Sequence, residues 1–157
     1  MRRIPILVVC AAVCTLALAG TGSAAPDGAQ LYQKCFGCHK NTGVGIPGVF
    51  PPLAGNAGKI GAAPGGRTYL IDALLYGLEG PIRVDGKDYD GKMPGFAGQF
   101  KDDEAAAVLN HVLGSWGNET LLPKGHKAIG AAEVKARRAK KLSPKQVHEA
   151  RQKLGLK

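Results

Sequence analysis

The stretch Cys35-Phe36-Gly37-Cys38-His39 decides how this 157-residue chain folds, because it places two thiols and an imidazole next to one another. Two cysteines three positions apart lie on one helical turn, where both thiols can reach the two vinyl groups of a single porphyrin and form thioethers. The histidine that follows then lies beneath the iron and offers a ring nitrogen as the proximal ligand. The pattern therefore predicts one haem c, held covalently through Cys35 and Cys38, with His39 on the iron.

Other kinds of site also use a Cys-x-x-Cys pair. A thioredoxin-like redox site would need a surrounding β-α-β pattern, which the sequence lacks. A zinc site would need a second cysteine pair, but Cys10 and Cys14 belong to an N-terminal segment that we expect to be removed. A structural disulfide in an oxidising compartment is the remaining alternative. The adjacent His39 favours haem over all three.

The N-terminus has the pattern of an export signal. Arg2 and Arg3 precede an apolar run from Ile4 to about Ala19, and small residues follow it. A membrane anchor is the alternative, but the apolar run is short of the roughly 20 residues that span a bilayer. We therefore predict that residues 1–25 are a cleaved signal peptide and that the protein is periplasmic.

The sixth position of the iron needs a ligand or stays open. Met93 is the one methionine after the initiator, and it lies in the Gly- and Pro-rich loop 90–96, which can present a side chain inward. Most methionines fill gaps in a core, and that alternative stands here too. His111, His126 and His148 are the rival ligands. We expect the Met93 thioether to be the axial ligand.

Three amphipathic stretches predict helices. The first runs from Asp27, a suitable N-cap, to about Cys38, and the second spans about 67–78. The third covers about 102–116, where apolar residues recur at helical spacing after an acidic first turn that suits the helix dipole. His111 points away from the apolar stripe of this third helix, which predicts a solvated histidine.

A short hairpin is predicted directly before the methionine loop. Asp85-Gly86 separates the runs 82–84 and 87–89, and this dipeptide between short strands is a strong signal for a two-residue turn. In that register Ile82 faces Tyr89, and the hairpin delivers the chain to the methionine loop.

Positive charge is concentrated at the C-terminal end of the chain, whose formal net charge is +9. Residues 27–117 contain eight Lys and Arg against nine Asp and Glu, whereas residues 118–157 contain eleven against three. Ser143-Pro144-Lys145-Gln146 predicts a helix start, although the thin apolar stripe after it predicts a helix that docks weakly or stays mobile. The basic tail is either a solvated segment or a docking arm for an acidic protein or an anionic membrane surface. An exported protein is a poor candidate for binding nucleic acid.

Three motifs in order along the chain carry a family resemblance. They are Cys35-Phe36-Gly37-Cys38-His39, Phe50-Pro51-Pro52-Leu53-Ala54-Gly55-Asn56 and Gly91-Lys92-Met93-Pro94-Gly95-Phe96. With these motifs, residues 26–118 resemble a bacterial class I, monohaem cytochrome c, similar to the cytochrome domains that serve exported dehydrogenases. The resemblance implies an all-α fold with three main helices wrapped round one haem. The small β-hairpin and the basic, partly helical tail, residues 119–157, are additions to that pattern.

The resemblance also implies roles for residues around the haem. A backbone carbonyl at Pro51 or Pro52 would accept a hydrogen bond from His39 and orient its imidazole. Leu53 would pack on the haem, and Asn56 could meet a propionate.

Electron transfer is the predicted function, and we do not expect an enzyme. No serine, histidine and carboxylate set stands at a suggestive spacing. An iron with His and Met ligands changes valence with little movement, and the thioether raises its reduction potential. We expect redox proteins as partners, with a dehydrogenase or reductase as donor and an oxidase or another cytochrome as acceptor. The open alternatives are a soluble shuttle, a fixed electron-accepting subunit, and a catalytic or ligand-sensing haem from which Met93 is displaced.

Overall fold

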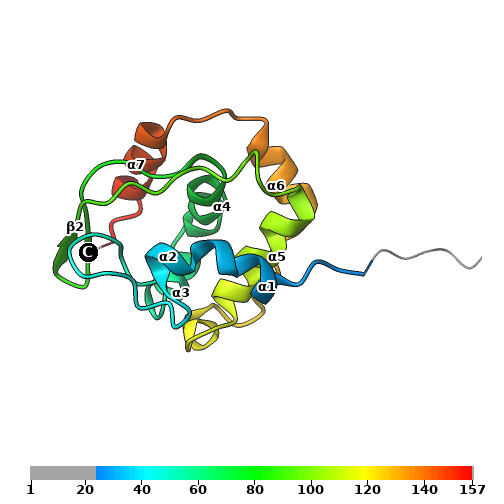
Figure 1. Cartoon of the computed structure of the whole chain (residues 1–157), viewed down its shortest axis with the longest axis horizontal. Coiled ribbons are helices and arrows are strands. Elements are labelled where there is room, and N and C mark those ends of the chain that lie inside the picture. Colours follow the sequence, from blue (N-terminus) through cyan, green and yellow to red (C-terminus); the bar gives the residue numbers. More distant parts are fainter. Residues whose placement is uncertain (1–23, 157) are drawn as a thin grey trace, which may run out of the picture.

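The computed structural model describes residues 24–156, whose helices pack together (Figure 1), and the buried side chains between them form an apolar interior. Apart from residues 24 and 25, the predicted signal peptide lies outside these residues, as do Cys10 and Cys14. Within the described range, no helix has both the length and the apolar character needed to cross a membrane.

The haem-attachment motif lies in one nearly continuous helical segment. It consists of α1 (Gly28–Tyr32), a 3₁₀ turn (Gln33–Cys35) and α2 (Phe36–His39). The Asp27 carboxylate accepts hydrogen bonds from the first free N–H groups, at 2.9 and 3.2 Å, as an N-cap should. The first predicted helix is therefore confirmed, with a tightened turn that ends at the first cysteine of the motif.

The other two predicted helices are α4 (Gly66–Tyr76) and α5 (Asp102–Leu113). The α5 helix ends before Trp116, whose φ of 55° is left-handed and cannot continue a right-handed helix. The α1 and α5 helices cross with their backbones in contact, because a Cβ atom on Gly28 would lie 2.2 Å from the carbonyl oxygen of Ala107. The glycine is what allows this close crossing.

The hairpin has the predicted strands and register. Its strands are β1 (Ile82–Val84) and β2 (Lys87–Tyr89), and Ile82 pairs with Tyr89. Asp85 and Gly86 have φ values of 49° and 79°, the left-handed pair that a tight hairpin turn requires. One further helix, α3 (Asn56–Ala62), was not predicted.

The tail packs on residues 26–118, the predicted haem domain, so the prediction that its last helix docks weakly or stays mobile is wrong. It contains a 3₁₀ turn (Asn118–Leu121) and two helices, α6 (Ala131–Arg138) and α7 (Pro144–Lys153). The α6 helix contacts α4 and α5, and α7 packs against α4. Val134 and Val147 are fully buried, and Ser143 caps α7 with the predicted capping box. Although the apolar stripe of α7 is thin, its apolar side chains pack against the core.

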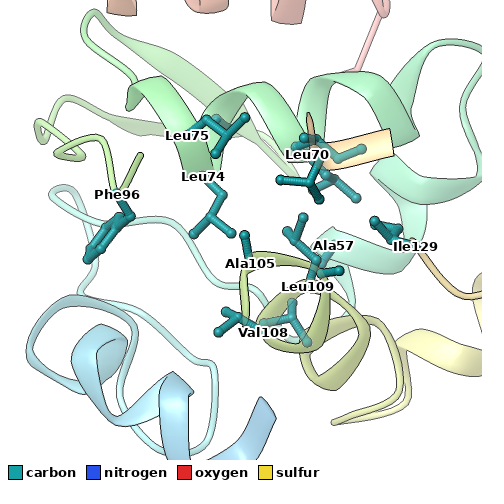
Figure 2. Packing of buried hydrophobic residues seen from close by; sticks show 14 of the residues in the cluster. Ala57, Leu70, Leu74, Leu75, Phe96, Ala105, Val108, Leu109 and Ile129 are labelled. Carbon is teal, nitrogen blue, oxygen red and sulfur yellow. The ribbon is translucent and has the colours of Figure 1, made fainter. Parts of the chain in front are cut away.

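One apolar cluster joins these helices. Leu70 and Leu74 of α4 face Val108 and Leu109 of α5 across the interior, and Ile129 of the tail closes one side (Figure 2). The tail therefore contributes to the same core as the haem domain.

Arginines and lysines of the tail have different roles. The three tail arginines turn toward the haem domain: Arg137 pairs with Asp72, Arg138 with Asp102, and Arg151 is buried. Every tail lysine in the described range is exposed: Lys124, Lys127, Lys135, Lys140, Lys141, Lys145 and Lys153. The planar guanidinium can satisfy a carboxylate with two parallel bonds, whereas lysine is a strongly hydrated point charge.

Candidate functional site

The two cysteine thiols are available for attachment. Cys35 is buried, Cys38 is partly buried, and neither forms a disulfide. Burial, together with the neighbouring Cys38, raises the pKa of the Cys35 thiol to about 11. Before attachment this group is therefore a protonated thiol at neutral pH.

His39 is held in an orientation that suits an iron ligand. It is 8% exposed, and its Nδ1 atom lies 3.1 Å from the carbonyl oxygen of Pro51. That carbonyl can only accept, so Nδ1 carries the proton and Nε2 keeps its lone pair. Burial lowers the pKa of His39, although the hydrogen bond to Pro51 opposes the effect, and the ring is kept in the neutral form that binds metals.

Two adjoining apolar hollows meet at this histidine. Both are lined by the same six residues: Cys35, His39, Pro51, Leu78, Ile82 and Met93. The first hollow extends past Val49 and Phe96. The second extends into the helical core between α4 and α5, where Leu74 and Val108 point into the interior (Figure 2). A flat apolar macrocycle of which one edge reaches solvent fits this space, since Val49 is 42% exposed.

Met93 is brought to the same space as His39. Its N–H and carbonyl both pair with Leu78, at 3.0 Å each, in an isolated antiparallel bridge. Gly77 passes so close that a Cβ atom there would lie 2.3 Å from the carbonyl oxygen of Met93. The backbone of the methionine is thus fixed on both sides.

None of the three rival histidines lines either hollow. His111 is half-buried against the rings of Tyr32 and Trp116, with centroid distances of 5.4 and 5.9 Å. The prediction of a solvated His111 is therefore wrong, because the ring that points off the apolar stripe of α5 meets the aromatic side chains of α1 and the following loop. His126 and His148 are also partly buried, in the tail.

Leu53 and Asn56 both line the second hollow. The Asn56 amide nitrogen donates to the carbonyl oxygen of Pro52 at 3.1 Å, and the side chain is 7% exposed. This bond fixes the side chain at the start of α3. All seven predicted site residues therefore lie in the walls of these two adjoining hollows.

Arg151 is a site residue that sequence reasoning missed. It is 5% exposed, lines the second hollow, donates to the carbonyl oxygen of Arg83 at 3.2 Å and lies 5.8 Å from the ring centroid of Tyr69. No carboxylate pairs with it within residues 24–156. A buried cation without an acidic partner suits an anionic ligand, and haem carries two carboxylates. No local pattern in the tail could have indicated this position.

Two thiols for covalent attachment, a buried and oriented imidazole, and an apolar cavity with a cation in its wall fit a haem and define a c-type haem protein. The cytochrome c family model matches residues 25–116, and the chain belongs to the cytochrome c family. The family identifies the fold as that of a class I cytochrome c, with haem c bound covalently through Cys35 and Cys38. The chain's function is electron transfer.

Similar proteins support the family assignment, and the similarity to one of them extends beyond residues 25–116. A cytochrome c-552 of Thermus thermophilus is 55% identical over 142 residues, which is 90% of this chain and 95% of that protein. The cytochrome c subunit of a quinone-dependent alcohol dehydrogenase from Gluconobacter oxydans is 36% identical over 66% of this chain and 21% of its own length. The cytochrome c subunit of gluconate 2-dehydrogenase from Pantoea cypripedii is 35% identical over 62% of this chain and 22% of its own.

Proposed function

We propose that this chain carries single electrons on an iron held between His39 and Met93, in the periplasm, after removal of residues 1–25. The observation that carries the ligand assignment is that Met93 and His39 line the same two hollows while the other described histidines line neither. Residues 1–25 supply the argument for export, since they combine a basic start, an apolar run and small residues.

Bound haem supplies an iron that gains or loses one electron. The chain keeps that change reversible by holding both ligands and excluding water. Pro51 fixes the His39 ring, the bridge to Leu78 fixes Met93, and Phe96 and Leu78 close the apolar wall around them. A site that moves little between two valence states has a low barrier to outer-sphere exchange, which suits a carrier.

We propose redox proteins as partners, and the outward tail lysines as the surface that attracts them. The named relatives include cytochrome subunits of dehydrogenases, which supports a partner of that kind for this chain. Seven exposed lysines give the tail a positive field that would steer an acidic protein surface. An anionic membrane surface would be attracted by the same charges. Co-purification with a large partner would indicate a fixed subunit, and its absence a soluble shuttle.

Replacing Met93 tests the proposed axial ligand. Met93→Ala should remove the thioether-to-iron charge-transfer band of the ferric protein and let cyanide bind without delay. Met93→His should lower the midpoint potential, because imidazole favours ferric iron more than a thioether does. His126→Ala is the matched control and should leave the band and potential unchanged.

If Met93→Ala leaves the ferric spectrum and potential as they are, the sixth ligand is another group. If the unaltered protein already binds cyanide at once, the iron is open, and the catalytic or ligand-sensing alternative replaces the carrier.

A further inference from the structure

The segment that ends in Met93 forms a closed loop over the first hollow. The bridge between Leu78 and Met93 joins the two ends of this segment, residues 78–93, and the β1–β2 hairpin lies between them. Gly80, Ile82 and Tyr89 of the loop all line the hollow. A movement that carries the Met93 backbone away from the cavity would therefore also move this loop.

Side chains of helix α7 form two hydrogen bonds to the outer side of the loop. His148 lies on α7, and its Nε2 atom is 2.7 Å from the carbonyl oxygen of Pro81, to which it donates. The imidazole lies flat against Gly80, because a Cβ atom there would be 3.2 Å from three of its ring atoms. Arg151, one turn further along, donates to the carbonyl oxygen of Arg83. The helix itself cannot shift easily, since Val147 is fully buried in the core.

Two ion pairs also hold the loop, and both are exposed. Lys59 pairs with Asp85 at the hairpin turn, with side chains 48% and 58% exposed. Lys92 pairs with Glu79 near the base, with side chains 77% and 54% exposed. Exposed ion pairs of this kind contribute little and weaken with salt. The His148 bond also lies at the surface, but together with the bond from the buried Arg151 it makes up the side-chain hydrogen bonding that reaches residues 80–83 from outside the loop within the described residues.

We propose that His148 is a positioning residue for Met93: it holds the 78–93 loop closed and so keeps the thioether on the iron. The proposal rests on the ligation by Met93 proposed above. His148 lines neither hollow, so any effect of changing it must pass through the loop and not through direct contact with haem. His148 would thereby influence the redox centre without contacting it.

The test uses the full-length ferric holoprotein and the rate of cyanide binding under conditions where release of Met93 limits that rate. His148→Ala should raise the rate about fivefold, which is the effect of removing one ordinary hydrogen bond from the closed state. His148→Gln retains a donor and should restore most of the unaltered rate. His148→Phe keeps a ring over Gly80 without a donor and should fall between the two.

Two controls separate positioning from a general loss of stability. Lys145→Ala changes an exposed residue of the same helix, and Glu133→Gln weakens the attachment of α6; neither should accelerate cyanide binding. Cyanide binding at the unaltered rate in both His148→Ala and His148→Phe would overturn the proposal. So would an equal acceleration in Glu133→Gln, since loosening any part of the tail would then suffice. Met93→Ala reports separately on the ligand: if it fails to speed cyanide binding, the ligation itself is wrong whatever His148 does.

Discussion

Changing Arg137 to Ala should destabilise the whole protein, although Arg137 lies in the tail and far from the haem motif in sequence. Its guanidinium donates two hydrogen bonds to the Asp72 carboxylate, at 2.8 and 2.6 Å. Asp72 is 2% exposed, and within the described residues its carboxylate has no other side-chain partner. The substitution would leave a negative charge buried and unpaired in the middle of α4.

The expected loss of unfolding free energy is about 3 kcal/mol. Breaking a buried ion pair from one side costs about 3–5 kcal/mol, and the lower end applies because the Arg137 side chain is 26% exposed. For a domain of this size such a loss corresponds to a fall of about 10 °C in the thermal midpoint. Replacing both partners, Asp72→Leu with Arg137→Leu, should recover most of the loss, because no buried charge then remains.

Denaturant unfolding of the ferric holoprotein, followed by circular dichroism, measures these differences. Lys135→Ala is the matched control on the same helix and should change the free energy of unfolding by less than about 0.5 kcal/mol. If Arg137→Ala is as mild as Lys135→Ala, the tail is not part of the folding unit and the reasoning from the buried pair is refuted.

Three further outcomes are expected. With Cys35 and Cys38 both changed to Ala, the exported chain should not yield a cooperatively melting helical domain, because haem supplies much of the apolar interior; a stable apo-domain would count against this. The hydrogen bonds from Arg67 lower the pKa of Glu133, so this pair stabilises the protein above the carboxyl's unfolded pKa and is lost as pH falls through the lower folded value. Glu133→Gln should therefore reduce the loss of unfolding free energy that occurs below about pH 4. An unchanged dependence of stability on pH in this range would contradict a stabilising role for the pair of Arg67 and Glu133. Changing Lys140 and Lys145 to Glu should slow electron transfer with the protein's redox partner at low ionic strength and flatten its salt dependence, and equal rates would leave the lysines without a docking role.

Features set by neighbouring residues were predictable from the sequence. The Asp85-Gly86 turn fixed the hairpin register, and Ser143 with Gln146 fixed the start of α7, because each depends on contacts within a few residues. The bond from His39 also goes to Pro51, one of the two carbonyls that the family resemblance implied. The separate roles of His39 and Met93 as iron ligands remain predictions.

Features set by distant partners were not predictable. The α7 helix was expected to dock weakly because its apolar stripe is thin, whereas Val147 is fully buried in the core. The α6 helix is held by the ion pair between Arg137 and Asp72, which are 65 positions apart in the chain. Arg151 reaches the haem cavity only because α7 packs on α4. The α3 helix was missed because its residues are mainly small, and its packing against α4 and the turn at residues 118–121 decides its conformation. Local propensity says little in such segments.

A spectroelectrochemical titration of the full-length holoprotein tests the central claim most directly. We expect one reversible one-electron wave, with the thioether-to-iron band present in the ferric form and lost in Met93→Ala, whose midpoint potential should shift markedly. A ferric form without that band, or a Met93→Ala variant that titrates at the unaltered potential, would contradict an iron held between His39 and Met93.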